Sequence, residues 1–231
     1  MARKKVVMIL LEGYTDEEAL GTFFVDYFTN DRVITHVLYT DITSKDSSLP
    51  STIKAKVGNC IKEKLKQSKL NIRDVIKVIH IVDMDGAYID DAFIHVEPTQ
   101  ITFRYDENGI YYKDKNTVSN RNKRKRQNLE KLWRNTSGIC NGIGYQIYYM
   151  SCNLEHVLHG IIDAPKDKKS ELAIKFAKEY GGNLEKFLRF IKYSNFSVNT
   201  NYKGSWEFIT EELHSLERHT NLGLCFSESE E

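Results

Sequence analysis

The sequence predicts an α/β protein in which a mostly parallel sheet is flanked by helices and followed by a helical C-terminal extension. A continuous apolar run at 6–11 and an almost wholly apolar run at 75–82 are typical of strands buried on both faces. Segments with helical periodicity separate these runs and a further β-rich run between them. The resulting order of strand, helix, strand, helix and strand favours right-handed crossovers, and therefore a parallel sheet.

The N-terminal elements follow from their local patterns. The strand at 6–11 precedes a helix that starts near Thr15, where a hydroxyl N-cap and an acidic first turn suit a helix N-terminus. Residues 33–39 form the second β-rich run. Residues 51–68 predict an amphipathic helix, because apolar side chains recur four positions apart and lysines occupy the other face.

Beyond the third strand the regular alternation breaks. A hairpin is expected at 101–112, with Asn108-Gly109 in its turn. A basic segment follows; its centre, RNKRKR (Arg121–Arg126), is expected to be a solvated loop that leads into a helix at 127–133. The remaining expected elements are a strand at 146–150, helices at 153–159, 168–180, 184–193 and 205–219, and a frayed tail at 227–231.

These elements suggest two parts. We expect an α/β domain over residues 1–160, with the hairpin and basic segment inserted near 98–134, and a helical extension over 161–231 packed on it.

Composition excludes several classes of protein. The chain has 231 residues and is 41% hydrophobic, so it is neither disordered nor of low complexity. Its 33 basic and 32 acidic residues give a net charge of +1, so any nucleic-acid contact must come from a local patch. Four cysteines without a CxxC pair argue against a zinc knuckle or a disulfide framework, and are typical of reduced intracellular thiols.

The N-terminus superficially imitates a signal peptide. A basic Arg3-Lys4-Lys5 precedes the first apolar run, but Glu12 ends that run before it reaches the roughly 7–15 residues that a signal peptide needs. No apolar stretch is long enough for a membrane span. The sequence therefore predicts a soluble, cytoplasmic protein.

Two acidic clusters directly follow two of the apolar strands. Glu12-Gly13-Tyr14-Thr15-Asp16 follows the first strand, and Asp83-Met84-Asp85-Gly86 follows the third. In a parallel sheet both clusters reach the carboxyl edge, where such folds bind ligands. Alternation along the strand places Asp83 and Asp85 on one face. Four converging carboxylates repel unless a divalent cation neutralises them, and hard oxygen ligands suit Mg²⁺ or Mn²⁺.

At these residues the chain resembles a known fold family. A strand followed by Glu-Gly and a helix, with a later strand followed by DxD-Gly, resembles the Rossmann-like Toprim domain of primases, topoisomerases and nucleases. EGYTD (12–16) is similar to the EGxxD/E motif of the overcoming-lysogenization-defect and RloB-like groups. Residues 148–159 also resemble the RloB-like stretch SNPxFExWLLxH, without its proline and tryptophan and with Glu155 as the main matching acid. The resemblance covers residues 5–160.

This resemblance implies a metal-dependent nuclease. Glu12 would be the general acid/base, Asp83 and Asp85 would bind a metal ion, and Asp16 and Glu155 would hold a second one. Some RloB-like proteins act in phage defence and are encoded beside an ATPase partner. Independently of the family, phosphodiester transfer builds negative charge that divalent ions stabilise, and a glutamate can move protons.

Other interpretations of the same residues stay open. Residues 81–86 also resemble the first motif of haloacid-dehalogenase-type phosphatases, with Asp83 as nucleophile and Asp85 as acid/base, but no acidic pair follows residue 145 and Glu12 would have no role. The chain could instead be a non-catalytic Toprim module that binds nucleotide or nucleic acid, or serves an ATPase.

Three further features each have two interpretations. The basic run either is solvated or binds nucleic-acid phosphates, with nearby aromatic residues as stacking surfaces. His156 and His159 form either a zinc pair or packing contacts, and Cys152 is either a nucleophile or a buried thiol. The candidate phosphate-binding residues are Arg121, Lys123, Arg124, Lys125 and Arg126.

Overall fold

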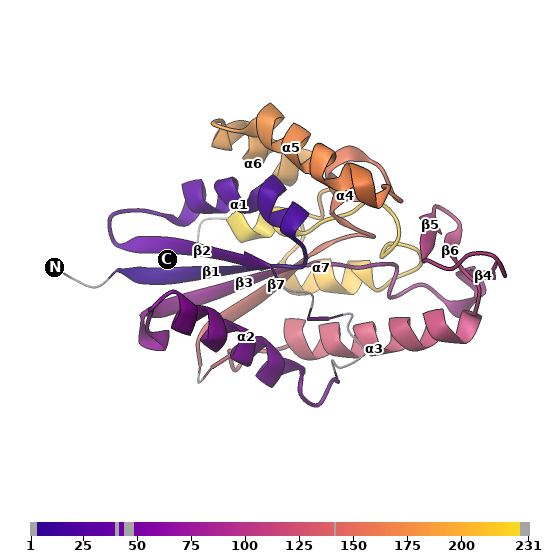
Figure 1. Cartoon of the computed structure of the whole chain (residues 1–231), viewed down its shortest axis with the longest axis horizontal. Coiled ribbons are helices and arrows are strands. Elements are labelled where there is room, and N and C mark those ends of the chain that lie inside the picture. The colour runs from indigo at the N-terminus through magenta and orange to yellow at the C-terminus, as the bar shows by residue number, and fades with distance from the viewer. Residues whose placement is uncertain (1–3, 40–41, 44–48, 141, 227–231) are drawn as a thin grey trace.

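The computed structural model describes residues 4–39, 42–43, 49–140 and 142–226. At its centre lies a four-stranded sheet in the order β2-β1-β3-β7 (Figure 1). Every pairing in this sheet is parallel, so the predicted mostly parallel α/β fold is confirmed. The four strands are β1 (Lys5–Leu11), β2 (Val33–Tyr39), β3 (Val75–Asp83) and β7 (Gly144–Met150).

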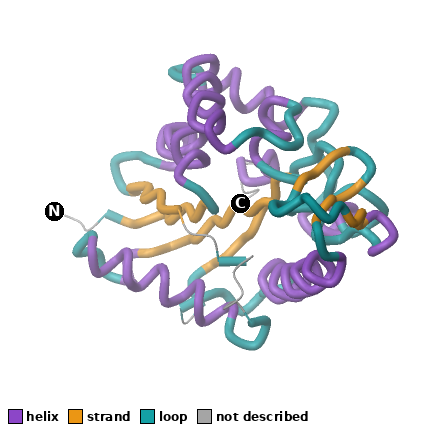
Figure 2. The backbone as a smooth tube through the Cα atoms, turned by 45° about the vertical axis from the view of Figure 1, so that its right-hand side comes forward, coloured by secondary structure: helices purple, strands orange, loops and turns teal. Residues whose placement is uncertain are grey.

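Helices cover both faces of the sheet (Figures 1 and 2). Alternate side chains of β1 enter two separate apolar clusters, since Ile9 belongs to one and Met8 to the other. The helices of the first face are α1 (Tyr14–Phe28), α5 (Lys169–Tyr180) and α6 (Leu184–Tyr193), and those of the second are α2 (Ile53–Gln67) and α3 (Lys115–Trp133).

The C-terminal residues belong to the same core as the sheet. Phe176 and Phe187 of α5 and α6 pack with strand residues in the first cluster, and Trp206 of α7 (Tyr202–Ile209) packs in the second. The Trp206 indole N–H also donates to the Ile147 carbonyl of β7, 3.2 Å away. Helix α7 therefore covers the outer side of β7, which would otherwise be an open sheet edge.

A small second sheet lies beyond the carboxyl end of the main sheet. It contains β4 (Ile94–Val96), β5 (Arg104–Asp106) and β6 (Gly109–Tyr112) in the order β4-β6-β5. The antiparallel β5–β6 pair confirms the predicted hairpin, whereas β4 was not anticipated. A side chain at Gly109 would place its Cβ 2.0 Å from the Phe93 carbonyl oxygen, so this turn requires glycine.

Two predicted local structures are wrong. Residues Arg121–Arg126 are not a loop, because α3 already begins at Lys115, with the Asp114 carboxylate as its N-cap. The helix predicted at 205–219 ends at Ile209, and the Ser215 and His219 carbonyls instead accept backbone hydrogen bonds from the loops after β3 and β7. The remaining short elements are α4 (Leu154–His159) and 3₁₀ turns at Ile72–Asp74, Asp91–Phe93, Lys166–Lys168 and Leu222–Phe226.

The predicted frayed tail at 227–231 lies outside the described residues. Within the described part of the chain, no helix has both the length and the apolarity required to cross a bilayer.

Candidate active site

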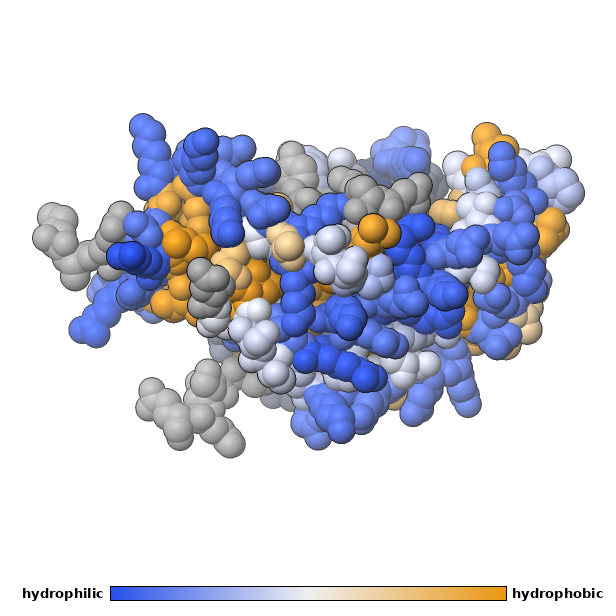
Figure 3. Space-filling model, turned by 90° about the horizontal axis from the view of Figure 1, so that it is seen from below, coloured by the Kyte–Doolittle hydropathy of each residue, from blue (hydrophilic) through white to orange (hydrophobic). Residues whose placement is uncertain are grey.

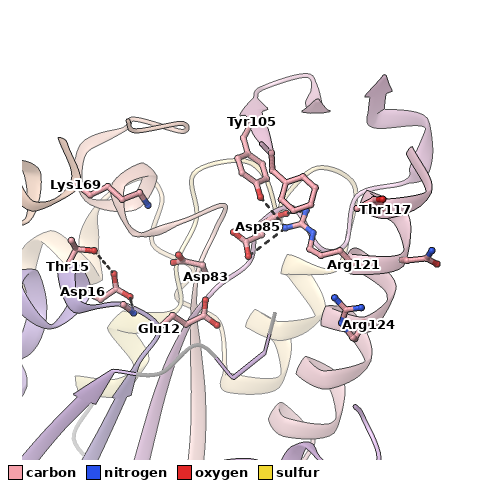
Figure 4. Close-up of a pocket in the computed structure, with 13 residues that line it drawn as sticks. Glu12, Thr15, Asp16, Asp83, Asp85, Tyr105, Thr117, Arg121, Arg124 and Lys169 are labelled. Atoms are coloured by element: carbon pink, nitrogen blue, oxygen red, sulfur yellow. Dashed lines mark hydrogen bonds and ion pairs between the residues drawn. The ribbon is translucent and has the colours of Figure 1, made fainter. Parts of the chain in front are cut away.

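The four acids predicted to converge line one cavity at the carboxyl edge of the sheet (Figure 4). Glu12 follows the last residue of β1, and Asp83 is the last residue of β3. Asp85 lies two residues further along, and Asp16 comes from the first turn of α1. The cavity has a volume of about 700 Å³, which is large enough for a small substrate or a segment of a polymer.

Local hydrogen bonds orient the two acids of the first motif. The Glu12 Oε1 atom accepts from the Thr43 hydroxyl, and its Oε2 atom lies 3.8 Å from the Lys125 ammonium. The Asp16 carboxylate accepts from the Gly13 backbone N–H at 3.0 Å, which satisfies a donor at the start of α1. The same side chain that faces the cavity therefore also caps the helix.

Acidic charge accumulates around Asp83. Burial raises the pKa of Asp83 well above its usual value, and the nearby carboxylates of Asp16, Glu12 and Asp85 raise it further. Burial also raises the pKa of Asp16 to about 6, an effect that the Gly13 hydrogen bond opposes and the charge of Glu155 reinforces. This half of the cavity holds more negative charge than the adjacent cations balance.

The other half of the cavity is already neutralised by α3. Lys125 has no exposed side-chain surface, and its ammonium lies 2.5 Å from Asp85 Oδ2. Arg121 lies 3.8 Å from the same carboxylate and donates to the Asp85 carbonyl at 3.0 Å. Although burial opposes ionisation of Asp85, the charges of Lys125 and Arg121 outweigh it and lower the pKa of this carboxyl.

The five basic residues of α3 therefore separate into different environments. Arg121 and Lys125 are buried against Asp85, Arg124 lines the cavity, Arg126 is half-buried and Lys123 is exposed. The predicted common phosphate-binding run is thus divided between the site and the surface. The buried residues of the helix recur at helical spacing and include two of the five basic residues: Val118, Arg121, Asn122, Lys125, Asn128, Leu129 and Leu132.

Glu155 occupies a different position from the other four acids. It lies in the first turn of α4, and its carboxylate accepts from the Lys169 ammonium at 2.9 Å. Among the described residues that line the cavity, Lys169 is present and Glu155 is not. The predicted second-ion ligand is therefore paired with a lysine, and it anchors that lysine at the cavity wall.

A second cavity of about 380 Å³ continues the first across the site. Because Asp83, Asp85 and Lys169 line both cavities, the two meet above the DxD motif. Phe103 and Tyr105 of the small sheet region also line both, and the Arg121 guanidinium lies 4.7 Å from the centre of the Phe103 ring. The result is a groove that has carboxylates at its base and aromatic side chains in its wall.

Several residues that shape this groove are not predicted from the sequence. Thr43, which donates to Glu12, follows the second strand in a segment that carries no motif. Lys169, Phe103 and Tyr105 come from segments far from either acidic motif along the chain, so only the folded arrangement brings them to the carboxylates.

The surroundings of Cys152 and His156 do not favour their predicted alternative roles as nucleophile and metal ligand. Burial raises the pKa of the Cys152 thiol well above its usual value, and the charges of Asp85 and Asp83 add to this effect, so Cys152 stays a protonated thiol. Burial lowers the pKa of His156 to about 4, and Arg218 and His219 contribute. The neighbouring cationic side chain of Arg218 disfavours a metal ion at His156.

No family model, curated protein or solved structure matches this chain. The resemblance to Toprim domains therefore rests on residues 12–16, 83–86 and 148–159 alone. The chemistry of the site is argued from its own geometry.

Proposed function

We propose that this protein is a divalent-metal-dependent, nuclease-like phosphodiesterase that acts on nucleic acid. The observation that supports this function is the meeting of Glu12, Asp16 and Asp83 at one sheet edge, where burial and the neighbouring negative charges raise the pKa of Asp83. A divalent cation would balance this charge. It would also supply the stabilisation that phosphodiester cleavage requires.

The donor set fits Mg²⁺ or Mn²⁺. Asp83 and Asp16 offer only oxygen ligands, which these hard cations prefer. Asp85 is less available as a ligand than its place in the DxD motif suggests, because Lys125 and Arg121 already bind it. When bound, the ion would stabilise charge on the phosphate oxygens and lower the pKa of a water molecule.

The remaining side chains have roles of their own. Glu12, fixed by Thr43, is placed to hold or move a proton at its carboxylate oxygens. Arg124 and Lys169 line the cavity and can contact non-bridging phosphate oxygens. Phe103 offers an aromatic face on which a nucleobase can stack.

The outer face of helices α2 and α3 suits a polyanion. Helices α2 and α3 lie side by side beneath the sheet, and the face that they form is mostly hydrophilic (Figure 3). Helices α2 and α3 carry more basic than acidic side chains, since their acidic residues are Glu63 and Glu130. Lysines of this kind contact the phosphate backbone without reading sequence, and make binding salt-dependent. The exposed lysines of these two helices are Lys54, Lys62, Lys66, Lys115, Lys123 and Lys131.

The test is a cleavage assay with labelled single- and double-stranded DNA and RNA, with Mg²⁺ or Mn²⁺ and with a chelator. Glu12→Gln and Asp83→Asn should each lower the rate by at least about 10²-fold, as expected for loss of an acid/base group or a metal ligand. Asp26→Asn, an exposed change on α1 that also removes one carboxylate, is the matched control and should cleave normally.

Each outcome of this assay has a clear meaning. Cleavage that is unchanged by either site substitution would contradict the proposal. Metal-dependent binding of nucleic acid without cleavage of any substrate would support the non-catalytic module instead. The phage-defence role and the ATPase partner that the resemblance implies remain predictions beyond this experiment.

A further inference from the structure

The irregular segment between α7 and the last 3₁₀ turn carries a cluster of side chains of the types that bind metal ions, and none of them lines the acidic cavity. His214, Glu217 and His219 each offer one ligand atom, and these atoms all lie within 4.8 Å of one another. His219 Nε2 and Glu217 Oε2 are 3.3 Å apart. Two ligands of a tetrahedral Zn²⁺, each at about 2.0–2.1 Å, are separated by about 3.3 Å.

The His214 ring is oriented as a metal ligand requires. Its Nδ1 atom lies 2.7 Å from the Phe208 carbonyl oxygen, so this nitrogen carries the proton and donates it. The lone pair is therefore on Nε2, the nitrogen left to bind a ligand. Zinc-binding histidines typically donate their second nitrogen to a carbonyl or carboxylate in this way.

Aromatic packing holds both imidazoles in place. The Phe208 ring stacks on His214 with centroids 3.9 Å apart, and meets the edge of His219 at 4.9 Å. The histidines therefore lose little further side-chain freedom on binding an ion, which lowers the entropic cost of forming the site.

The same segment supports the loops of the acidic cavity. The Ser215 carbonyl accepts from the backbone N–H groups of Gly86 and Cys152. Ser151 donates its N–H to the His219 carbonyl and its hydroxyl to the His214 carbonyl, at 2.8 and 2.6 Å. The backbone of the cluster thus holds the turn after Asp85 and the turn before α4.

We propose that His214, Glu217 and His219 form a Zn²⁺ site that fixes this supporting segment. Imidazole ligands favour zinc and related transition metals, whereas the all-oxygen acidic cavity suits Mg²⁺ or Mn²⁺. Three protein ligands leave one tetrahedral position for water. The site is independent of the proposed phosphodiesterase function, since it uses none of the four cavity acids.

The test uses the full chain, equilibrated with ZnCl₂ in the presence of excess Mg²⁺ and then analysed for bound zinc by mass spectrometry. Glu217→Gln and His219→Gln should each weaken zinc binding at least about tenfold. Glu211→Gln, an exposed change of the same charge in the same segment, should bind like the natural chain. Asp83→Asn should also retain zinc, because it alters only the acidic cavity.

Visible absorption after replacement with Co²⁺ provides a second measurement, since tetrahedral imidazole ligation gives intense bands. Glu217 is half-exposed, with 50% of its side-chain surface accessible, so Glu217→Gln should fold normally, which near-ultraviolet circular dichroism checks. Equal zinc affinity in Glu217→Gln and Glu211→Gln would overturn the proposal. So would loss of zinc in Asp83→Asn, or the absence of zinc binding by the natural chain.

Discussion

Asp83 and Asp85 lie two residues apart in one motif, yet the fold gives them opposite electrostatic surroundings. Burial and the carboxylates of Asp16 and Glu12 raise the pKa of Asp83. Desolvation opposes ionisation of the half-buried Asp85 as well, but Lys125 and Arg121 outweigh it and lower its pKa. The difference comes from α3, whose basic side chains reach one carboxylate and leave the other among acids.

The contrast between Asp83 and Asp85 explains how four acids can share one cavity. A buried lysine already provides the positive charge that Asp85 needs, and the remaining imbalance lies at Asp83, Asp16 and Glu12. A carboxylate with a protein cation is a stable structural element, whereas one among other carboxylates is a natural position for an external cation. Residue type alone therefore does not identify the metal ligand within a DxD motif.

The largest expected effect comes from removing the internal cation. Lys125→Met leaves the half-buried Asp85 carboxylate without its closest partner, which should cost about 3 kcal/mol of the free energy of unfolding, the lower end of the range for breaking a buried pair. Chemical denaturation measures this loss. Lys123→Met makes the same change at an exposed position of the same helix, and should stay within about 0.5 kcal/mol of the natural chain.

The double variant Lys125→Met with Asp85→Asn refines this result. It removes both charges of the pair, so it should recover part of the stability that Lys125→Met loses. If Lys125→Met unfolded like Lys123→Met, the neutralised half of the cavity would not depend on this ion pair.

The second largest effect is the pH dependence that Asp16 contributes in the absence of metal. Because burial raises the pKa of Asp16 to about 6 from 3.8, the native state binds this proton more tightly than the unfolded state. The associated stability is present below pH 3.8 and is lost as the pH rises through 6. The loss amounts to at most about 3 kcal/mol.

Asp16→Asn isolates this contribution, since an asparagine oxygen can still accept from the Gly13 N–H at the start of α1. The difference in unfolding free energy between the natural chain and this variant, measured with a chelator between pH 4 and 7, should grow in favour of the variant. A difference that stays constant with pH would show that the fold does not raise the pKa of Asp16.

The sequence predicts the main sheet and the meeting of its acidic residues well. Largely apolar runs identify β1 and β3, and the parallel order then brings Glu12 and Asp83 to one edge. Both conclusions depend on patterns within single strands and on a general rule of topology, so they need no knowledge of long-range packing.

The sequence does not predict which acid is neutralised. Lys125 has the appearance of a surface residue in a basic run, and only the register of α3 directs it inward. The helix itself is hard to predict because its inner face includes polar and charged residues where an apolar stripe is expected. Similarly, residues 210–219 have helical composition, but tertiary hydrogen bonds to Gly86 and Cys152 override it.

A smaller effect should distinguish the two carboxylates by their response to metal. Asp83→Asn relieves repulsion, so it should stabilise the metal-free protein at pH 7. Asp85→Asn should destabilise it, because Lys125 then lacks its partner.

Thermal melting with a chelator measures the direction of both stability changes. Added Mg²⁺ or Mn²⁺ should then raise the melting temperature of Asp85→Asn but not of Asp83→Asn. The same sign for both substitutions would contradict the division of the cavity.

The smallest expected effect concerns the groove wall above the two carboxylates. Phe103 lines both cavities, and a nucleobase stacked on it would contribute about 1 kcal/mol, the lower end of the range for such contacts. Phe103→Ala should therefore weaken binding of a single-stranded oligonucleotide about fivefold, as measured by fluorescence anisotropy with Mg²⁺ present and Glu12→Gln preventing turnover. Phe93→Ala, which truncates a partly exposed phenylalanine outside the residues that line either cavity, is the control. Because stacking tolerates any base, the loss should be similar for different sequences, and a loss confined to one base would indicate specific readout instead.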